Sequence, residues 1–331
     1  MARRMTTEDQ LAGLRRLRTG ESSAQALAEL EQLLRTPRAH GLVIKGAAEL
    51  AHKWEARALI PALVAAAEAL APDALGTEAP KRDPGCEGKE AILRALVDWE
   101  AEVPDLYWKA AKWQQRAPMM NGSKDVAAEC RGLAALGLAQ TRGGTAGPDA
   151  AVMQLIDLLA DEEAATRARA AQALGLWPGA APVLRLKAHV GDEEAQVTGE
   201  VFAALLRHDV RQQLDFVAGF LDDEDTRLVE AAALALGESR QAQALPHLTA
   251  ACDRLARDPV RTSLLMAIVL LRQEESLAWL LGQIATARPA AAVEILEALR
   301  LYRGDEKAVA RIAQAARGRP EAARAFDEMF A

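Results

Sequence analysis

Apolar residues recur along most of this chain at the spacing of amphipathic helices that each bury one face. In the second half, helical runs alternate with short polar turns. These runs cover residues 162–176, 181–190, 192–207, 210–221, 224–236, 241–255, 259–271, 274–285, 289–302, 306–317 and 320–330. The first half follows the same plan less regularly, with runs at residues 7–18, 22–34, 39–53, 56–71, 88–100, 105–115, 125–140 and 149–160. No alternating, strand-like run stands out, so the pattern predicts an all-α chain.

Several of these runs end in nearly the same four residues, which indicates an internal repeat. The endings lie at residues 134–137, 172–175 and 234–237, with a degenerate copy at 203–206. The last residues of the final three copies follow one another at intervals of 31 residues. Helix pairs that repeat at this period are typical of an α-solenoid, in which each unit buries its apolar face only against its neighbours. We therefore expect a right-handed α-solenoid of about eight antiparallel HEAT-like helix pairs.

A single solenoid over residues 1–331 is the expected domain organisation, because a solenoid grows by adding repeats to one core. Residues 1–140 are predicted to form irregular repeats with insertions at 72–87 and 116–124, and residues 148–331 to form regular repeats. The amphipathic segment 320–330 is expected to close the core. Long irregular connections inside a compact array often carry function, which directs attention to the two insertions.

Composition restricts the classes of function. The net charge of −7 over 331 residues argues against a general binder of nucleic acid or anionic membranes. The three cysteines, Cys86, Cys130 and Cys252, are far apart and form no Cys-x-x-Cys motif, so neither a disulfide framework nor a cysteine-rich zinc site is expected. The sequence shows no apolar leader and no uninterrupted apolar run of about 18 residues, so we expect a cytoplasmic protein with no membrane segment.

The second half resembles HEAT-like repeats of the bacterial PBS-lyase type. The resemblance rests on residues 161–175, where an acid is followed by arginines and an Ala-Ala-x-Ala-Leu-Gly ending, on 225–237, and more weakly on 258–261. It implies the fold and no particular activity. The di-iron hydroxylases that share this fold carry repeated His-Glu dipeptides, and this chain contains none, which excludes that enzyme class.

The first half also resembles a group of uncharacterised bacterial HEAT-repeat proteins. The matching residues are Asp83-Pro84-Gly85-Cys86, Lys89, Ala91-Ile92, Ala95-Leu96, Pro104-Asp105-Leu106, Gln114-Gln115-Arg116 and the stretch 125–132. In that group an aromatic residue and two glycines usually precede the last of these motifs, where this chain has Met119-Met120-Asn121-Gly122. The resemblance covers most of the chain, and it brings no chemistry with it.

Arg167, Arg227 and Arg261 recur at equivalent helix positions after acidic residues. This spacing fits either a ladder for phosphate or Asp–Arg pairs that join adjacent repeats, and we favour the pairs. Residues 85–89 have the glycine and lysine of a phosphate loop but lack its spacing, its Ser/Thr and a preceding strand. They predict instead a turn into a helix, whose N-terminus would make Cys86 a candidate reactive thiol.

The aromatic segment 99–113 and the insertion after it are the most distinctive region of the chain. Four of its residues are aromatic, and Arg116 follows directly. Glu129 and Arg131 are polar residues inside an otherwise apolar helix. Exposed aromatics and arginines make good anchors for a partner, although core packing is the commoner reason for buried tryptophans. The predicted partner-binding residues are Trp108, Trp113, Arg116, Glu129 and Arg131.

These observations predict a non-catalytic scaffold or adaptor that binds a protein or peptide partner on a concave helical surface. Two alternatives stay open at this point. One is a HEAT-like bilin lyase or isomerase, suggested by the repeat consensus, and the other is a HEAT-like DNA-binding or glycosylase-type protein, against which the acidic charge argues. The sequence predicts no catalytic, cofactor-binding or metal-binding residue and no cofactor, and it leaves the oligomeric state open.

Overall fold

The computed structural model of this chain describes residues 6–72, 81–120, 122–256 and 259–330. Internal contacts divide the chain into two compact units, Met1–Trp177 and Pro178–Ala331. The structure is 73% helical, which confirms the all-α solenoid class predicted from the sequence. Among the described residues, no helix combines the length and the apolar character needed to cross a membrane.

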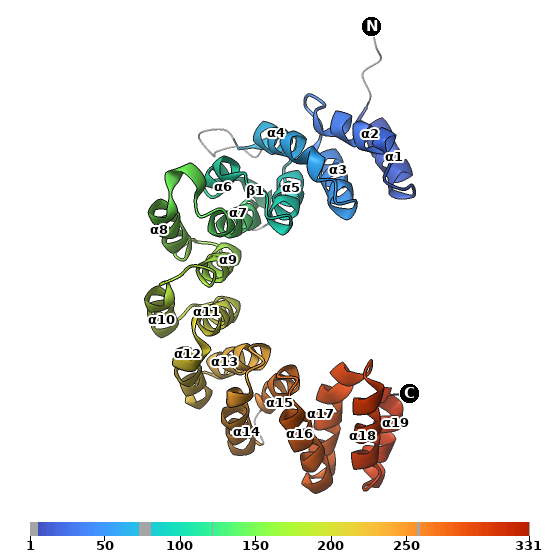
Figure 1. The fold of residues 1–331 in the computed structure, drawn as a ribbon, viewed down its shortest axis with the longest axis vertical. Coiled ribbons are helices and arrows are strands. Elements are labelled where there is room, and N and C mark those ends of the chain that lie inside the picture. Colours follow the sequence, from blue (N-terminus) through green and yellow to red (C-terminus); the bar gives the residue numbers. More distant parts are fainter. Residues whose placement is uncertain (1–5, 73–80, 121, 257–258, 331) are drawn as a thin grey trace. The chain divides into compact units, whose positions relative to one another are not determined.

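The first unit is a stack of helix pairs in two layers. It contains α1 (Thr7–Arg18), α2 (Ala24–Leu34), α3 (Gly41–Lys53), α4 (Ile60–Leu70), α5 (Glu87–Asp98), α6 (Pro104–Ala110), α7 (Ala128–Gln140), α8 (Pro148–Leu158) and α9 (Ala164–Leu174). Helices α3, α5, α7 and α9 pack successively against one another, and α4, α6 and α8 lie behind them (Figure 1). The faces between these layers are built from Ala and Leu, which lets neighbouring helices approach closely.

The second unit repeats this arrangement. It contains α10 (Ala181–Val190), α11 (Ala195–His208), α12 (Val210–Ala218), α13 (Thr226–Glu238), α14 (Leu245–Arg254), α15 (Arg261–Leu270), α16 (Glu274–Thr286), α17 (Pro289–Leu299), α18 (Glu306–Ala316) and α19 (Pro320–Phe330). Helices α11, α13, α15, α17 and α19 pack in succession, and α16 packs against α18 in the other layer. The segment 320–330, expected to close the core, is α19, which buries Ala322 and Ala325 against its neighbours.

The glycines that end the repeated four-residue segments permit close contact between helices. A Cβ atom at Gly237 would lie 2.5 Å from the carbonyl oxygen of Ala267 on α15, and one at Gly137 would lie 2.5 Å from the ring of Tyr107 on α6. Contacts this short do not occur for real Cβ atoms, so only glycine fits at these two positions without a shift of the neighbouring helix. At Gly137 and Gly237 the glycine of the repeat is therefore a packing requirement.

Several helices of the α3, α5, α7 layer end in the same turn. Glu55, Glu100 and Arg142 each follow their helix by two residues and adopt positive φ angles of 51°, 52° and 51°. In each case the next amide donates back to the carbonyl oxygen five residues earlier, at 2.9, 2.9 and 3.1 Å. This is the Schellman pattern, which satisfies the last helical carbonyls and normally favours glycine at the positive-φ position.

The repeated arginines act within and between repeats. Arg261 is buried and pairs with Glu294 on α17 at 2.5 Å, so it connects α15 to the next repeat. Arg227 pairs with Asp225 at the start of its own helix at 2.7 Å. Arg167 donates to the carbonyl oxygen of Asp161 at 2.8 Å. Each of these contacts stabilises the fold through charge-assisted hydrogen bonds.

The structure corrects the prediction at both insertions. Residues 116–124 were expected to be an irregular connection in an all-α chain, and they form a hairpin of strands β1 (Arg116–Met119) and β2 (Gly122–Asp125). The helix predicted at 105–115 is accordingly shorter, because it ends at Ala110 to let the chain enter this hairpin. Of the other predicted insertion, 72–87, residues 73–80 lie outside the described residues, and Glu87 already belongs to α5.

Candidate functional site

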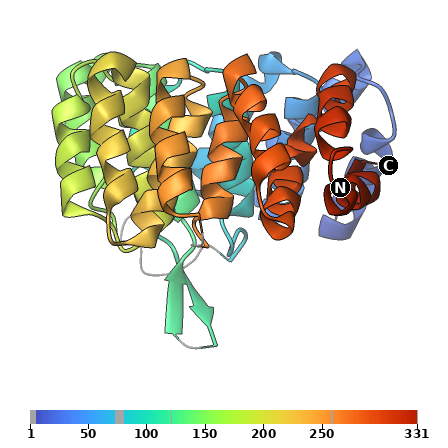
Figure 2. The same cartoon turned by 90° about the horizontal axis from the view of Figure 1, so that it is seen from below.

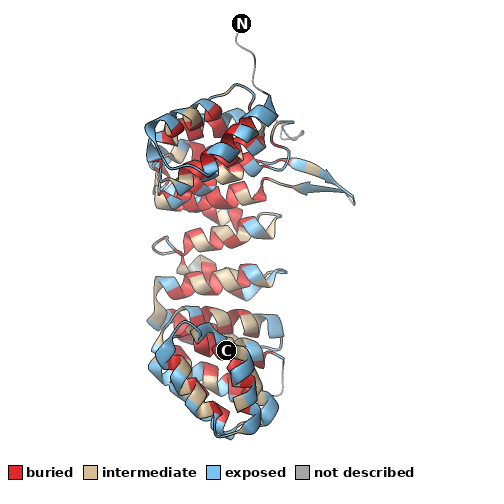
Figure 3. Cartoon of the chain, turned by 90° about the vertical axis from the view of Figure 1, so that its right-hand side faces the viewer, coloured by how far each residue is buried: buried red, intermediate tan, exposed pale blue. Residues whose placement is uncertain are grey.

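The hairpin projects away from the helices of the first unit (Figure 2). Arg116 lies opposite Asp125 and Met119 opposite Gly122 in its register. Its distal part is largely exposed (Figure 3): Met119 is 58% exposed, and Met120 is fully exposed. A two-stranded hairpin is at best marginally stable in water by itself. Its order must therefore come from contacts at its base.

Arg131, in the first turn of α7, makes the central contact at this base. Its guanidinium Nε and Nη2 donate to the two carboxylate oxygens of Asp161, each at 2.8 Å. Its Nη1 donates to Asp125 Oδ2 at 2.5 Å and to the carbonyl oxygen of Trp113 at 2.8 Å. The planar fork of an arginine suits such a bidentate pair with a carboxylate. Arg131 thereby connects the end of β2, the segment before β1 and the turn that leads to α9.

Asp125, the last residue of β2, is the main acceptor in this group. Burial acts to raise the pKa of Asp125, but hydrogen bonds from the amides of Ala127 and Gln115 and from Arg131 outweigh it, so the pKa lies below its usual value. The two amide hydrogen bonds measure 3.0 and 3.1 Å. Asp125 is therefore ionised at neutral pH, as its pairing with the Arg131 cation requires.

A second buried ion pair lies beside the first. Lys89 of α5 has no exposed surface, and its Nζ lies 3.1 Å from Asp83 Oδ2. The same Nζ donates to the carbonyl oxygen of Leu70 at 3.1 Å and to Gln115 Oε1 at 3.0 Å. Asp83 in turn accepts the amides of Gly88 and Lys89 at the start of α5. All three ammonium protons of Lys89 thus have acceptors, which compensates for burying the charge.

Gln115 joins the two ion pairs. Its side chain is fully buried, and Nε2 donates to the carbonyl oxygens of Asp83 at 2.8 Å and Pro84 at 3.1 Å. Its backbone amide donates to Asp125, and its carbonyl oxygen accepts the amide of Val126 at 2.9 Å. Gln115 directly precedes β1, so both ion pairs fix where the hairpin leaves the helices. We call this set the hairpin anchor: Asp83, Lys89, Gln115, Asp125, Arg131 and Asp161.

Three of the five residues predicted to bind a partner meet at the hairpin. Arg116 is the exposed first residue of β1, where it donates to Ser123 Oγ at 3.2 Å and lies 3.6 Å from Glu162. Trp113 and Arg131 are buried, 7% and 4% exposed. They can position the hairpin, but their side chains present little surface to a partner.

The other two predicted residues lie apart from the hairpin. Trp108 on α6 is half-buried, and its Nε1 donates to the carbonyl oxygen of Gly143 at 2.9 Å. Glu129 on α7 is half-buried and lies between Arg94 of α5 at 3.2 Å and Arg169 of α9 at 3.3 Å. Glu129 is thus part of a row of partly exposed ion pairs that crosses α5, α7 and α9.

Reasoning from the sequence did not assign Lys89, Gln115 or Asp125 to this site. The burial of Lys89 could have been predicted from its position in the sequence. It lies three residues before Ile92 and seven before Leu96, on the helix face that the apolar pattern predicts to be buried. A lysine on such a face requires a buried partner. Gln115 lies in a short connection, and no pattern in the sequence marks it.

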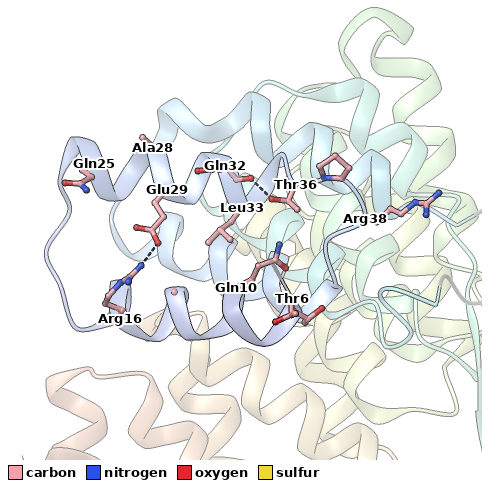
Figure 4. Close-up of a pocket in the computed structure, with 13 residues that line it drawn as sticks. Thr6, Gln10, Arg16, Gln25, Ala28, Glu29, Gln32, Leu33, Thr36 and Arg38 are labelled. Atoms are coloured by element: carbon pink, nitrogen blue, oxygen red, sulfur yellow. Dashed lines mark hydrogen bonds and ion pairs between the residues drawn. The ribbon is translucent and has the colours of Figure 1, made fainter. Parts of the chain in front are cut away.

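A groove of about 910 Å³ between α1 and α2 is the alternative site in this unit. Gln10, Gln32 and Thr36 are among the polar residues that line it (Figure 4). Its facing charges, Arg16 and Glu29, pair with each other at 2.8 Å. These two charges neutralise one another, which leaves Arg38 as the other charged residue of the lining. Among the described residues, no group of three or more His, Cys, Asp or Glu side chains could hold a metal ion.

Comparison with known proteins identifies the repeat type. Residues 182–269 match the HEAT repeats family, which identifies the repeats in this part of the chain. No curated protein gives a significant match. Among solved structures, human deoxyhypusine hydroxylase in complex with glycerol is similar over 82% of this chain and 92% of its own, with 22% sequence identity and a TM-score of 0.30. A similarity at this level transfers no activity.

Proposed function

We propose that this HEAT-repeat protein is a non-catalytic scaffold that binds a protein partner, and that the hairpin of residues 116–125 is its leading contact. The observation that carries the proposal is the combination of an exposed apolar tip with a buried, fully paired anchor. The two buried ion pairs order one small hairpin, although its distal residues Met119 and Met120 are exposed. A partner that binds the tip would explain why the protein orders this hairpin.

The side chains of the hairpin indicate the chemistry of that partner. Met119 and Met120 present flexible, polarisable apolar surface, which suits an apolar cleft. Arg116 and Lys124 are exposed on the two strands, and Lys124 has no ion-pair partner in the part of the chain that the structure describes. Asp125 is already neutralised by Arg131. We therefore propose a partner whose apolar cleft is bordered by acidic side chains.

The residues proposed from the sequence take different roles in this account. Arg116 contacts the partner directly, whereas Trp113 and Arg131 position the hairpin. Glu129, in its row with Arg94 and Arg169, gives a second, polar contact surface on the helices, and Trp108 holds the neighbouring loop at Gly143. A rigid, pre-ordered contact raises affinity because little conformational entropy is lost on binding.

We further place the protein among bacterial HEAT-repeat proteins of the PBS-lyase type that act in the cytoplasm. Support comes from the repeat consensus in the sequence and from three unpaired, buried cysteines, which fit a reducing compartment.

Affinity capture with matched variants tests the proposal. The full chain is immobilised as wild type, as a Met119→Ser/Met120→Ser variant and as Met153→Ser, and each is exposed to lysate with and without nuclease. Met153 on α8 is the control, because it is 57% exposed, like Met119, and lies outside the hairpin. We expect a dominant protein that survives nuclease, is retained by Met153→Ser and is reduced at least about tenfold by the hairpin variant.

Two results would count against the proposal. Capture that disappears with nuclease would indicate a nucleic-acid role. A protein retained equally by all three forms would show that the hairpin is not the contact, provided that circular dichroism shows the variants to be folded.

A further inference from the structure

The groove between α1 and α2 is a second candidate contact surface, and none of its lining residues belongs to the hairpin or to the hairpin anchor. Its lining extends from Thr7 to Arg16 on α1 and continues along α2 from Gln25. At about 1.5 Å per helical residue, the groove follows α1 for about 15 Å. An extended peptide advances about 3.3 Å per residue, so the groove has the length of about four or five peptide residues.

Three glutamine side chains line this groove. Gln10 on α1 is only 5% exposed, whereas Gln25 and Gln32 on α2 are exposed (Figure 4). None of the three side-chain amides has a hydrogen-bond partner in the part of the chain that the structure describes. The Gln10 amide has thus lost most of its contact with water without gaining a protein partner, which is unfavourable unless a ligand pairs with it.

The polar groups of the lining indicate the chemistry of that ligand. A glutamine amide carries one acceptor oxygen and an NH₂ donor, which match the N–H and C=O groups of a peptide main chain. Arg16 and Glu29 already pair with each other at 2.8 Å. Arg38, at the other end of the groove in Figure 4, is exposed and has no ion-pair partner among the described residues. These groups suit a ligand that is neutral over most of its length and carries one acidic group.

A nucleotide fits this lining less well than a peptide. The described lining residues include no aromatic side chain on which a base could stack. Arg38 is also the one unpaired cation among them, and phosphate groups are usually bound by several cations or by backbone amides.

Gly13 makes the groove accessible to a main chain. It is a buried lining residue within α1, where glycine lowers helix stability relative to alanine. A Cβ atom at this position would lie 3.4 Å from Glu29 Oε1, which is an ordinary contact. Helix packing therefore does not require glycine here, and its missing side chain leaves room for the close approach of another backbone.

We propose that this groove binds an extended segment of another protein, about four or five residues long, with one acidic side chain at the Arg38 end. The peptide groups of the segment pair with the amides of Gln10 and Gln32, and its carboxylate pairs with Arg38. This site is separate from the hairpin contact proposed above and does not depend on it.

A phage-displayed library of random heptapeptides, panned on the immobilised full chain, supplies the probes for the test. Selected peptides are synthesised with a fluorophore, and their dissociation constants are measured by fluorescence anisotropy. We expect the selected peptides to share one Asp or Glu, and replacing it with Asn or Gln should weaken binding by about three- to fivefold, as expected for an exposed ion pair.

Variants of the chain then locate the binding site. Gln10→Leu should raise the dissociation constant about tenfold, because it leaves peptide groups unpaired, and Arg38→Gln should raise it about three- to fivefold. Gly13→Ala should also weaken binding while leaving the fold at least as stable, since alanine is the better helix former. Arg15→Gln is the control, because Arg15 is exposed on α1, lies outside the lining and has no ion-pair partner among the described residues.

Three results would overturn the proposal. One is a panning experiment that selects no acidic heptapeptides, and another is unchanged binding of the selected peptides to Arg38→Gln and Gly13→Ala, which can be measured even if Gln10→Leu does not fold. The third is binding that is lost in the Met119→Ser/Met120→Ser chain and kept in the groove variants. That result would assign the peptides to the hairpin, so failure of this inference can be distinguished from failure of the proposed function.

Discussion

Replacing Arg131 with methionine removes the cation at the centre of the hairpin anchor while preserving most of the side-chain volume. The side chains of Asp125 and Asp161 are only 11% and 13% exposed, so both carboxylates would lose their counter-ion in a largely buried site. The carbonyl oxygen of Trp113 would lose its donor as well. Removing one member of a buried ion pair costs about 3–5 kcal/mol, and we expect Arg131→Met to lower the free energy of unfolding by about this amount.

Arg169→Met is the matched control for this substitution. This variant removes the ion pair between Arg169 on α9 and Glu129, which lies on α7 as Arg131 does. The Arg169 side chain, however, is 33% exposed. Ion pairs that reach solvent contribute about 0–1 kcal/mol, so this variant should remain close to the wild type. A difference of several kcal/mol between the two variants is expected because Arg131 is buried and pairs with two carboxylates, whereas Arg169 is partly exposed and pairs with one.

The effect of Arg131→Met should depend on pH. The pKa of Asp125 is lowered in the folded protein, so its contribution to stability is fully present above the unfolded pKa of about 3.9. This contribution is lost as the pH falls through the lower, folded pKa. The difference between wild type and Arg131→Met should therefore be constant near neutral pH and shrink below about pH 4.

Urea unfolding followed by far-UV circular dichroism measures the global effect, and hydrogen exchange of the Val126 amide, which donates to Gln115, measures opening at the hairpin base. We expect Arg131→Met to unfold at a lower urea concentration and to exchange faster at Val126. If Arg131→Met and Arg169→Met unfold at the same urea concentration at neutral pH, with unchanged exchange at Val126, the reasoning about the anchor is refuted.

Four further substitutions, one of them a control, test other contacts in the fold, each by its unfolding free energy in urea. Lys89→Met should cost about 3–5 kcal/mol, because it leaves a buried carboxylate unpaired, and an effect below about 1 kcal/mol would contradict the described burial. Glu100→Gly should stabilise the protein by about 0.5–1 kcal/mol, because glycine adopts the positive φ at this helix end without strain. A lower free energy of unfolding in this variant would contradict that reasoning. Gly237→Ala should destabilise the protein by about 1–3 kcal/mol, because the added Cβ would clash with Ala267. The control Gly199→Ala lies within a helix, with open space around its Cβ, and should stabilise by about 1 kcal/mol. If both variants changed the free energy of unfolding in the same direction, the packing argument would be refuted.

The helices of this fold could be predicted from the sequence because their signal is local. Apolar residues at three- and four-residue spacing marked nearly every helix, and the repeated four-residue endings marked the period. Gly237 could be recognised from the sequence as part of a repeat. That it allows close contact with α15 is known only from the structure. Local periodicity thus predicts the elements and the class, while the contacts between them need coordinates.

The hairpin could not be predicted because its order does not come from its own residues. Its strands read Arg-Ala-Pro-Met and Gly-Ser-Lys-Asp, without apolar alternation and with a proline, since neither face packs on a core. What orders them is a set of buried polar side chains from distant parts of the chain, such as Lys89, Arg131 and Asp161. No short window of sequence contains that information.

Arg131 and Trp113 show the limit of assigning a site from sequence. In a sequence, a polar residue within an apolar helix can belong either to a contact surface or to a buried polar network, and the same holds for an aromatic residue in a short segment. Only the positions of Asp125 and Asp161 around Arg131 show that its charge is satisfied inside the protein. Arg116 lacks such a setting: it is exposed on β1, with a Glu162 carboxylate oxygen 3.6 Å away.

Site-specific photo-crosslinking tests the central claim most directly. A photoreactive amino acid is placed at Met120, at the tip of the hairpin, or at Met153 on α8, and each full-length protein is irradiated in lysate of its own source after nuclease treatment. The account predicts one dominant protein adduct from position 120 that is absent from position 153. No adduct from position 120, or the same adducts from both positions, would contradict the claim that the anchored hairpin is the contact for a protein partner.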